Sequence, residues 1–381
     1  MKHKPAVLAL SFAGMIGAGA VAAAAEPAAR QPTLEPVAQF GHQVTGVSVS
    51  ERGRIFVNFP RWTEDAPVSV AEVMKDGSIK PYPDAQWNAW RNVTADETTP
   101  NDHWVCVQSV VADGRGSLWV LDPGSPAHDA IVPGAPKMVR IDLATDRVAQ
   151  TIAFDQSVAI PGSYLNDVRF SSDGKFAFIT DSGERGALVV VELASGKARR
   201  VLDGHPSTQP EKGVVVHSEG KPVRSPDGRK VQFAADSIAL SGDGYLYWKA
   251  LTGKTLYRIQ TSVLASRGFQ GQDVSGDVQP YGQTAPTDGL WIGRRGGKPA
   301  DQLYLSLIET NAIGVRDLSQ GPSGSTRTLV QDPRLRWPDT FSQGPDGSLY
   351  VTTSRIQDSA FYKKDAPGAL PTQLWRVKLR D

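Results

Sequence analysis

Short stretches of alternating apolar and polar residues recur along the chain, and a turn containing glycine interrupts each of them. The stretch NDVRFSSDGKFAFITD, which begins at Asn166, is typical, because apolar residues alternate with polar ones on both sides of Asp173-Gly174. Apolar positions with a period of two on either side of an Asp-Gly turn predict a β-hairpin.

This hairpin pattern occurs six times, at intervals of roughly 50 to 70 residues, which leaves room for two more strands in each repeat. Four-stranded units repeated in this way are typical of the blades of a β-propeller, because a blade buries both of its faces only when neighbours stack on it. A β-sandwich fits six equal repeats less well. The turn glycines of the six copies are Gly53, Gly116, Gly174, Gly244, Gly296 and Gly347.

The sequence therefore predicts an all-β fold, a six-bladed β-propeller with four-stranded blades that spans residues 34–381. The second position after each polar start holds an apolar residue, which predicts a buried column at Val47, Val110, Val168, Ile238, Leu290 and Phe341. A strand-like segment at the N-terminus, Thr33–Gly41, is expected to pair with the C-terminal QLWRVKLRD and close the last blade.

The first residues resemble a secretory signal peptide. Lys2 and Lys4 precede an apolar stretch, and an A-x-A cleavage site ends at Ala25. Removal of residues 1–25 would leave a short tail, residues 26–33, ahead of the propeller. We therefore expect an exported protein, located in the periplasm or outside the cell, with no membrane attachment after cleavage.

Composition narrows the possible partners. The formal net charge is +1, and loss of two lysines and no acidic residues with the signal peptide changes it to −1. This balance gives no basic surface for nucleic acid, and no protein partner is indicated. The single cysteine, Cys106, excludes an intramolecular disulfide; a small buried hydrophobe is the simpler interpretation, and a catalytic thiol is the alternative.

Two polar columns appear when the six repeats are aligned on their turn glycines. In a propeller the innermost strand of each blade starts near one mouth of the central channel, so both columns are expected to point into it. The first column consists of Thr45, Gln108, Asn166, Asp236, Asp288 and Asp339. The second consists of Gly46, Ser109, Asp167, Ser237, Gly289 and Thr340.

The oxygen-rich columns suggest a divalent cation. Hard cations bind carboxylate and amide oxygens, and a cation would relieve repulsion among the three aspartates of the first column. Neither column contains a cationic side chain. The alternative is that these side chains hydrogen-bond neighbouring blades and channel water without any ligand.

An aromatic-rich loop precedes the second blade, QWNAWRNVTADETTPNDHW, residues 86–104. It could form a lid over the channel mouth, with Trp87, Trp90 and Trp104 as flat surfaces for a ring-shaped ligand. It could equally be an insertion packed against the edge of a blade.

Several segments resemble the major royal jelly protein/Yellow family, in a bacterial secreted form: YLNDVRFSSDGKFAFITDSG, ADSIALSGDGYLYWKALTG, NAIGV and WPDTFSQGPDGSLYVTTSRI. The resemblance covers about Leu34 to Leu379 and implies a six-bladed propeller. It does not imply one activity, since relatives include dopachrome-converting enzymes, binders of biogenic amines and nutritive proteins.

The fold is also similar to the gluconolactonase/senescence marker protein group and to diisopropyl fluorophosphatase, which are propeller hydrolases with a calcium-type metal in the channel. Asn166 and Asp236 match two metal ligands of that group. Its first-blade Glu is not matched, because Thr45 and Gly46 stand there, and Gln108 replaces its second-blade Asn.

These considerations predict a divalent-cation-dependent hydrolase, with calcium as the expected ion and a small lactone or ester as the substrate. Asp236 is the candidate catalytic residue. Two alternatives stay open: a non-catalytic binder of a small aromatic or amine ligand, and a dopachrome-type isomerase. The candidate metal ligands are Asn166, Asp236, Gln108, Asp288 and Asp339, and the expected channel-lining residues are Thr45, Ser109, Asp167, Ser237, Thr340 and Trp104.

Overall fold

The computed structural model describes residues 1–2, 32–128, 130–295, 298–364 and 369–379. Almost all of the predicted signal peptide and the predicted turn glycine Gly296 lie outside these residues. No helix among the described residues is long and apolar enough to cross a membrane.

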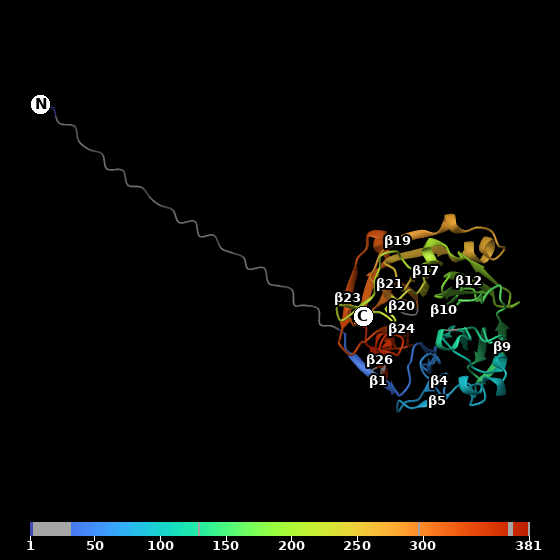
Figure 1. Ribbon diagram of the computed structural model, residues 1–381. Helices are drawn as coiled ribbons and strands as arrows, with labels where there is room; N and C mark the ends of the chain where they lie inside the picture. The colour runs from blue at the N-terminus through green and yellow to red at the C-terminus, as the bar shows by residue number, and fades with distance from the viewer. Residues whose placement is uncertain (3–31, 129, 296–297, 365–368, 380–381) are drawn as a thin grey trace. The chain divides into compact units, whose positions relative to one another are not determined.

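Six four-stranded antiparallel sheets follow one another round a ring within the described residues, so the predicted six-bladed propeller is confirmed. Figure 1 shows the ring, with β10, β20 and β24 near its centre and β5, β9 and β23 toward its rim. In each blade the first strand is the inner strand. The inner strands are β2 (Val47–Val49), β6 (Ser109–Ala112), β10 (Leu165–Phe170), β16 (Ala235–Leu240), β20 (Thr287–Arg295) and β24 (Pro338–Gln343).

The remaining strands complete the blades in chain order. Blade 1 adds β3 (Ile55–Asn58), β4 (Val70–Val73) and β5 (Ile79–Pro81). Blade 2 adds β7 (Ser117–Asp122), β8 (Lys137–Asp142) and β9 (Arg147–Ala153). Blade 3 adds β11 (Phe176–Asp181), β12 (Ala187–Glu192) and β13 (Ala198–Val201). Blade 4 adds β17 (Tyr245–Ala250), β18 (Thr255–Gln260) and β19 (Gln279–Gln283). Blade 5 adds β21 (Lys298–Leu307), β22 (Ala312–Asp317) and β23 (Thr326–Gln331). Blade 6 adds β25 (Leu349–Thr353) and β26 (Thr372–Val377), and its outermost strand is β1 (Leu34–Phe40), which comes from the other end of the chain.

The connections contain short elements only. A two-stranded hairpin consists of β14 (His217–Ser218) and β15 (Lys221–Pro222). The helical turns are η1 (Asn92–Glu97), η2 (Pro100–Asp102), η3 (Pro126–His128), η4 (Pro206–Thr208), α1 (Thr261–Val263), η5 (Leu264–Gly268), η6 (Ser275–Asp277), η7 (Leu318–Ser323) and η8 (Ile356–Asp358).

The hairpin turns form as the sequence predicts. Gly174 adopts a φ of 70°, a left-handed conformation that glycine takes at no steric cost. The preceding Asp173 accepts hydrogen bonds from the Ser171 hydroxyl, at 2.6 Å, and from the Lys175 backbone N–H, at 3.0 Å. Local turn chemistry therefore sets the register of the inner and second strands.

Apolar side chains of the inner strands pack between adjacent blades. The six residues of the predicted apolar column are each at most 2% exposed: Val47, Val110, Val168, Ile238, Leu290 and Phe341. This burial is the main favourable term that holds one blade against the next.

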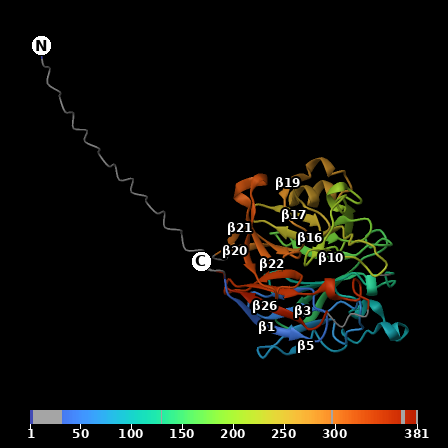
Figure 2. The same cartoon turned by 60° about the vertical axis from the view of Figure 1, so that its left-hand side comes forward.

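The two ends of the described chain close the ring. β1 pairs antiparallel with β26, from Leu34 opposite Val377 to Phe40 opposite Thr372, and both Figure 1 and Figure 2 show these strands side by side. Glu35 adds ion pairs with Arg376, at 2.5 Å, and Lys378, at 2.9 Å. The closure predicted from the two terminal segments is confirmed.

Closure by β1 predicts that its buried ring stabilises the whole propeller. Phe40 is 4% exposed and contacts Phe59 edge-to-face, with ring centroids 5.3 Å apart. Phe40→Ala should lower the free energy of unfolding by about 3 kcal/mol, because it leaves a cavity in the closing blade. Urea unfolding measures this. The neighbouring exposed Gln39→Ala should change stability by less than about 0.5 kcal/mol; equal effects of both variants would contradict a stabilising closure.

Candidate functional site

The polar starts of several inner strands surround a small cavity in the channel. It has a volume of about 10 Å³, room for roughly one water molecule or ion. The residues that line this channel cavity are Gln108, Ser109, Asn166, Asp167, Asp236, Asp288, Gly289 and Thr340. Sequence alignment of the repeats therefore brought together residues that are neighbours in space.

Three carboxyl groups from adjacent blades, Asp236, Asp288 and Asp339, form what we call the acidic cluster. The side chains of Asp236 and Asp288 hydrogen-bond to each other. Asn166 Nδ2 donates to Asp236 Oδ2 at 2.9 Å, and the Thr340 hydroxyl donates to Asp339 Oδ1 at 3.0 Å. The cluster thus sits in a network in which neighbouring side chains already supply hydrogen-bond donors.

Burial raises the affinity of the acidic cluster for protons. Burial raises the pKa of Asp288 to about 6, against a hydrogen bond from Trp337 that lowers it. Burial, followed by the charges of Asp288 and other channel aspartates, raises the pKa of Asp236 and of Asp339 well above the ordinary value. Deprotonating all three would place like charges together in a poorly solvated site, which is the physical cause of these shifts.

An arginine in the channel was missed by the sequence analysis. Arg169 is 8% exposed and pairs with Asp167 at 2.8 Å, while its second terminal nitrogen donates to the Leu290 carbonyl at 3.1 Å. Asp167 also accepts from the Ser109 hydroxyl at 2.7 Å. The period of two along an inner strand places Arg169 on the same side as Asp167, so extending the aligned columns by two positions would have found it.

Thr45 and Ser237 tie blades together. Both are buried; the Thr45 hydroxyl donates to the Gln108 carbonyl of blade 2 at 3.5 Å, and the Ser237 hydroxyl donates to the Thr287 carbonyl of blade 5 at 2.9 Å. These contacts match the scaffolding role that the sequence left open.

The prediction that Trp104 lines the channel is wrong. Trp104 is fully buried, lies 4.3 Å from the Trp87 ring, and donates its indole N–H to the Tyr82 carbonyl at 3.0 Å. An apolar ring gains more by packing against blades 1 and 2 than by facing a wet channel.

Cys106 is likewise buried. Burial, first of all, raises the pKa of its thiol to about 12, so no reactive thiolate forms at neutral pH.

Loops at the end of the ring where the inner strands begin form an apolar layer, which we call the mouth cluster. It consists of Trp62, Trp90, Val105, Cys106, Ala135, Tyr164, Val216, Val223, Val231, Leu251, Ile308, Trp337 and Ile356. Part of the aromatic-rich loop, Trp90, therefore does belong to the layer over the channel.

Two side chains of the mouth cluster connect it to the channel. Tyr164 accepts from the Trp62 indole at 2.7 Å and donates its hydroxyl proton to Gln108 Oε1 at 3.0 Å. Trp337 donates its indole N–H to Asp288 Oδ2 at 2.6 Å. Any displacement of these rings would therefore change the hydrogen bonding of the channel residues.

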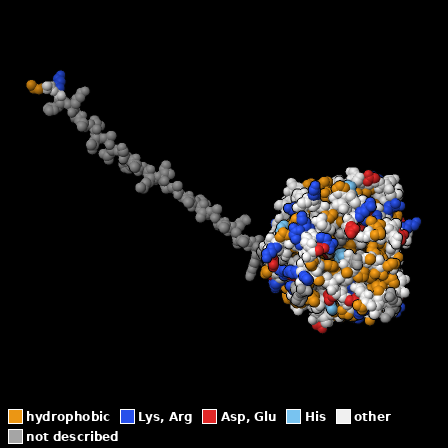
Figure 3. Space-filling model, viewed as in Figure 1, with side chains coloured by type: hydrophobic (Ala, Val, Ile, Leu, Met, Phe, Trp, Pro, Cys, Tyr) orange, Lys and Arg blue, Asp and Glu red, His pale blue; other side chains and the backbone are white. Residues whose placement is uncertain are grey.

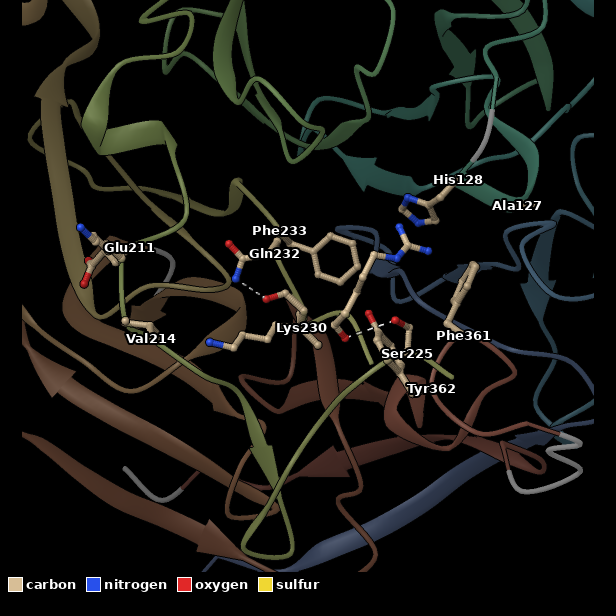
Figure 4. A pocket seen from close by; sticks show the side chains of 14 residues that line it. Ala127, His128, Glu211, Val214, Ser225, Lys230, Gln232, Phe233, Phe361 and Tyr362 are labelled. Carbon is tan, nitrogen blue, oxygen red and sulfur yellow. Dashed lines mark hydrogen bonds between the residues drawn. The ribbon is translucent and has the colours of Figure 1, made fainter. Parts of the chain in front are cut away.

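A larger cavity of about 710 Å³, the mouth pocket, lies among the loops at this same end of the ring. Its lining residues are Ala127, His128, Glu211, Lys212, Gly213, Val214, Ser225, Arg229, Lys230, Val231, Gln232, Phe233, Phe361 and Tyr362. Figure 4 shows His128, Phe233, Phe361 and Tyr362 together on one side, with Glu211 and Lys230 on the other. The sequence analysis did not identify this pocket, because its walls are connections between strands, and such connections carry no period that marks a site.

His128 is held in an unusual conformation in the mouth pocket. Ala127 and His128 both have left-handed φ values, 58° and 54°, which non-glycine residues adopt at a cost. The His128 ring stacks on Tyr164 with centroids 3.9 Å apart, and burial lowers its pKa to about 3, so the imidazole is neutral.

The channel residues fit a calcium-like ion in donor type, because carboxylate and amide oxygens surround a cavity of ion size. Their present positions do not: among the described residues, no three His, Cys, Asp or Glu side chains are placed to hold a metal together. Asn166 also directs its N–H group, not its oxygen, toward Asp236. The hydrogen bond between Asp236 and Asp288 requires a proton on one of these two carboxyl groups.

Comparisons with known proteins agree on the family and the fold. The family model described as major royal jelly protein matches residues 105–380. The protein yellow of Drosophila subobscura is 28% identical over 319 residues, covering 80% of this chain and 54% of that protein. The corresponding protein of Drosophila erecta is 22% identical over the same length, covering 80% and 57%. The chain thus spans about half the length of the curated relatives it matches.

Solved structures with low sequence identity share the fold alone. A luciferin-regenerating enzyme superposes with a TM-score of 0.53 at 11% identity, covering 91% of this chain and 95% of that chain. A gluconolactonase from Xanthomonas campestris gives a TM-score of 0.53 at 13% identity, covering 91% and 89%.

The raised pKa of Asp288 predicts a pH-dependent stability. The folded state retains this proton up to a pH of about 6, whereas an unfolded aspartate loses it near pH 4. The stability of the wild type relative to Asp288→Asn should therefore fall as the pH rises from 4 to 7, by about 2 kcal/mol. Urea unfolding at several pH values measures the difference.

The matched control is Asp301→Asn, which removes an exposed carboxyl group of the same blade. Its stability difference from the wild type should vary by less than about 0.5 kcal/mol over this range. A flat profile for Asp288→Asn would show that folding does not raise the pKa of Asp288.

Proposed function

The chain belongs to the major royal jelly protein family, and we propose that it binds a small, ring-bearing organic molecule in the mouth pocket. The observation that carries this proposal is the difference between the two cavities. The channel cavity, at about 10 Å³, is too small for an organic ligand, whereas the mouth pocket, at about 710 Å³, is of the size that such ligands occupy. The predicted export would place this binding outside the cytoplasm.

The shape of the pocket wall supports a flat ligand. The His128 ring lies 5.9 Å from Phe233 and 5.6 Å from Phe361, so three rings from three separate loops border one space. Aromatic walls favour planar ligands through stacked and edge-to-face contacts. The strained backbone at His128 supports the same proposal, because such strain concentrates at binding sites.

The pocket also lies next to the channel. Burial first, and then the charge of Asp288, raise the pKa of the pocket residue Tyr362. Tyr164 lies under the His128 ring and hydrogen-bonds Gln108. A ligand in the mouth pocket would therefore contact side chains that are one step from the acidic cluster.

The cation-dependent hydrolysis of a lactone or ester, predicted from the sequence, is the second candidate. It is favoured by the acidic cluster, whose protons a divalent cation could replace. Asn166, Asp236 and Asp288 would hold the ion, which would supply polarisation of the substrate carbonyl. Asp236 would hold and move a proton there. Because the mouth cluster covers the channel, the substrate must displace some of its rings first.

The isomerase alternative stays a prediction.

The binding proposal predicts a specific loss on removing one pocket ring. Phe361→Ala should weaken the binding of a neutral aromatic probe, 2-naphthol, about three- to tenfold, since one aromatic contact contributes about 0.5–1.5 kcal/mol. Isothermal titration calorimetry measures the affinity. The control is Phe269→Ala, a half-buried ring that lines a different cavity. Equal affinities of the wild type and Phe361→Ala would refute binding in the mouth pocket.

The hydrolase candidate predicts calcium-dependent stability. Calcium at about 100 times its dissociation constant would stabilise the folded protein by about 2.7 kcal/mol. Asp236→Asn keeps the side-chain shape but removes a charged ligand, so most of this shift should vanish, whereas the exposed Asp243→Asn in the same blade should keep it. Melting curves with calcium and with a chelator measure the shift, and hydrolysis of a lactone and ester panel is followed in parallel. Without a calcium shift in the wild type, the cation site is wrong.

A further inference from the structure

The charges around the mouth pocket differ in kind from those in the channel. Within the described lining residues, three side chains are cationic, Lys212, Arg229 and Lys230, and one is anionic, Glu211. We propose that the mouth pocket selects an anionic ring-bearing ligand, of the class of aromatic carboxylates, over the corresponding amine. This inference rests on the proposed function, because it names the ligand class of the same pocket.

The two lysines are available to a ligand. Lys212 and Lys230 are exposed, and neither forms an ion pair with any residue that the structure describes. In Figure 4 the Lys230 side chain lies on the side of the pocket opposite His128 and Phe361. Arg229 pairs with Asp227 at 2.6 Å, but this pair is largely exposed, with side chains 82% and 54% accessible. Such a pair is weak and its arginine can share a second anion.

The one acidic lining residue is already engaged. Glu211 Oε1 accepts the backbone N–H of Thr255 at 2.6 Å. The three aspartates of the acidic cluster are not among the residues that line the mouth pocket. Among the lining side chains, an amine in this pocket would therefore meet three cations and one carboxylate, which already accepts a hydrogen bond.

The ring and the charges come from one segment. The isolated pairing of Arg224 with Lys230 closes a hairpin that turns at Asp227 and Gly228. This hairpin places Lys230 three residues before Phe233, which faces His128 across 5.9 Å. A ligand bound here would contact Phe233 through its ring and the cationic side chains of the hairpin through its carboxylate. On the face drawn in Figure 3, lysine and arginine side chains are spread beside a broad apolar area.

Three probes with one ring and different charges test the inference: indole-3-acetate, indole-3-acetamide and tryptamine. Calorimetry on the full chain should show the anion binding about tenfold more tightly than the amine, with the neutral amide between them. Because the attraction is electrostatic and exposed, added salt should shrink this difference. In Lys212→Met/Lys230→Met the anion should lose about fivefold in affinity, as expected for two exposed charge pairs, while the amide stays within about twofold.

The matched control is Lys175→Met, which removes an exposed lysine from the hairpin turn of blade 3 and should leave all three affinities unchanged. Melting curves establish that both lysine variants fold. If the amide binds and loses affinity in Phe361→Ala but the amine binds as tightly as the anion, the charge inference is wrong and the binding proposal stands. An anion preference that is undiminished in Lys212→Met/Lys230→Met also overturns the inference. If no probe binds, both are overturned.

Discussion

Ring closure is the constraint on which the site depends. The pairing of β1 with β26 joins the two ends of the described chain and holds six inner strands around one narrow channel. Because every inner strand begins at the same end of the ring, the polar residues at these starts meet even though they are far apart in sequence. The hydrogen bond between Asp236 and Asp288, from neighbouring blades, is a direct consequence of this convergence.

The narrow channel in turn determines the chemistry of the acidic cluster. With a cavity of about 10 Å³, the carboxyl groups have few water molecules to solvate their charges. Their pKa values are therefore raised, and they accept hydrogen bonds from Asn166 and Trp337. The neighbouring Asp167 differs from them because it forms an ion pair with Arg169 at 2.8 Å. Two kinds of aspartate therefore lie side by side in one channel, distinguished by whether a cation is within reach.

The sequence predicts the regular part of this structure well and the irregular part poorly. Blades, turns and the closing strand follow from periods and turn residues, and alignment of the repeats places Gln108, Asn166, Asp236 and Asp288 around one cavity. Alignment cannot give the direction of a side-chain amide, so Asn166 was expected to offer oxygen and instead donates N–H to Asp236. Trp104 was misplaced because an aromatic loop residue carries no signal of which surface will bury it.

The mouth pocket shows why function can diverge while the propeller is retained. Its walls belong to the β7–β8 connection, the long segment between β13 and β16, and the β25–β26 connection, none of which contributes to the repeats. These connections can change in length and charge without disturbing the buried column between blades. The pocket nevertheless stays coupled to the channel, since Tyr164 lies against His128 on one side and bonds Gln108 on the other. A ligand that shifts His128 would therefore shift the ring that anchors the channel amide, which makes Tyr164 the physical link between the loops of the mouth pocket and the strands around the channel.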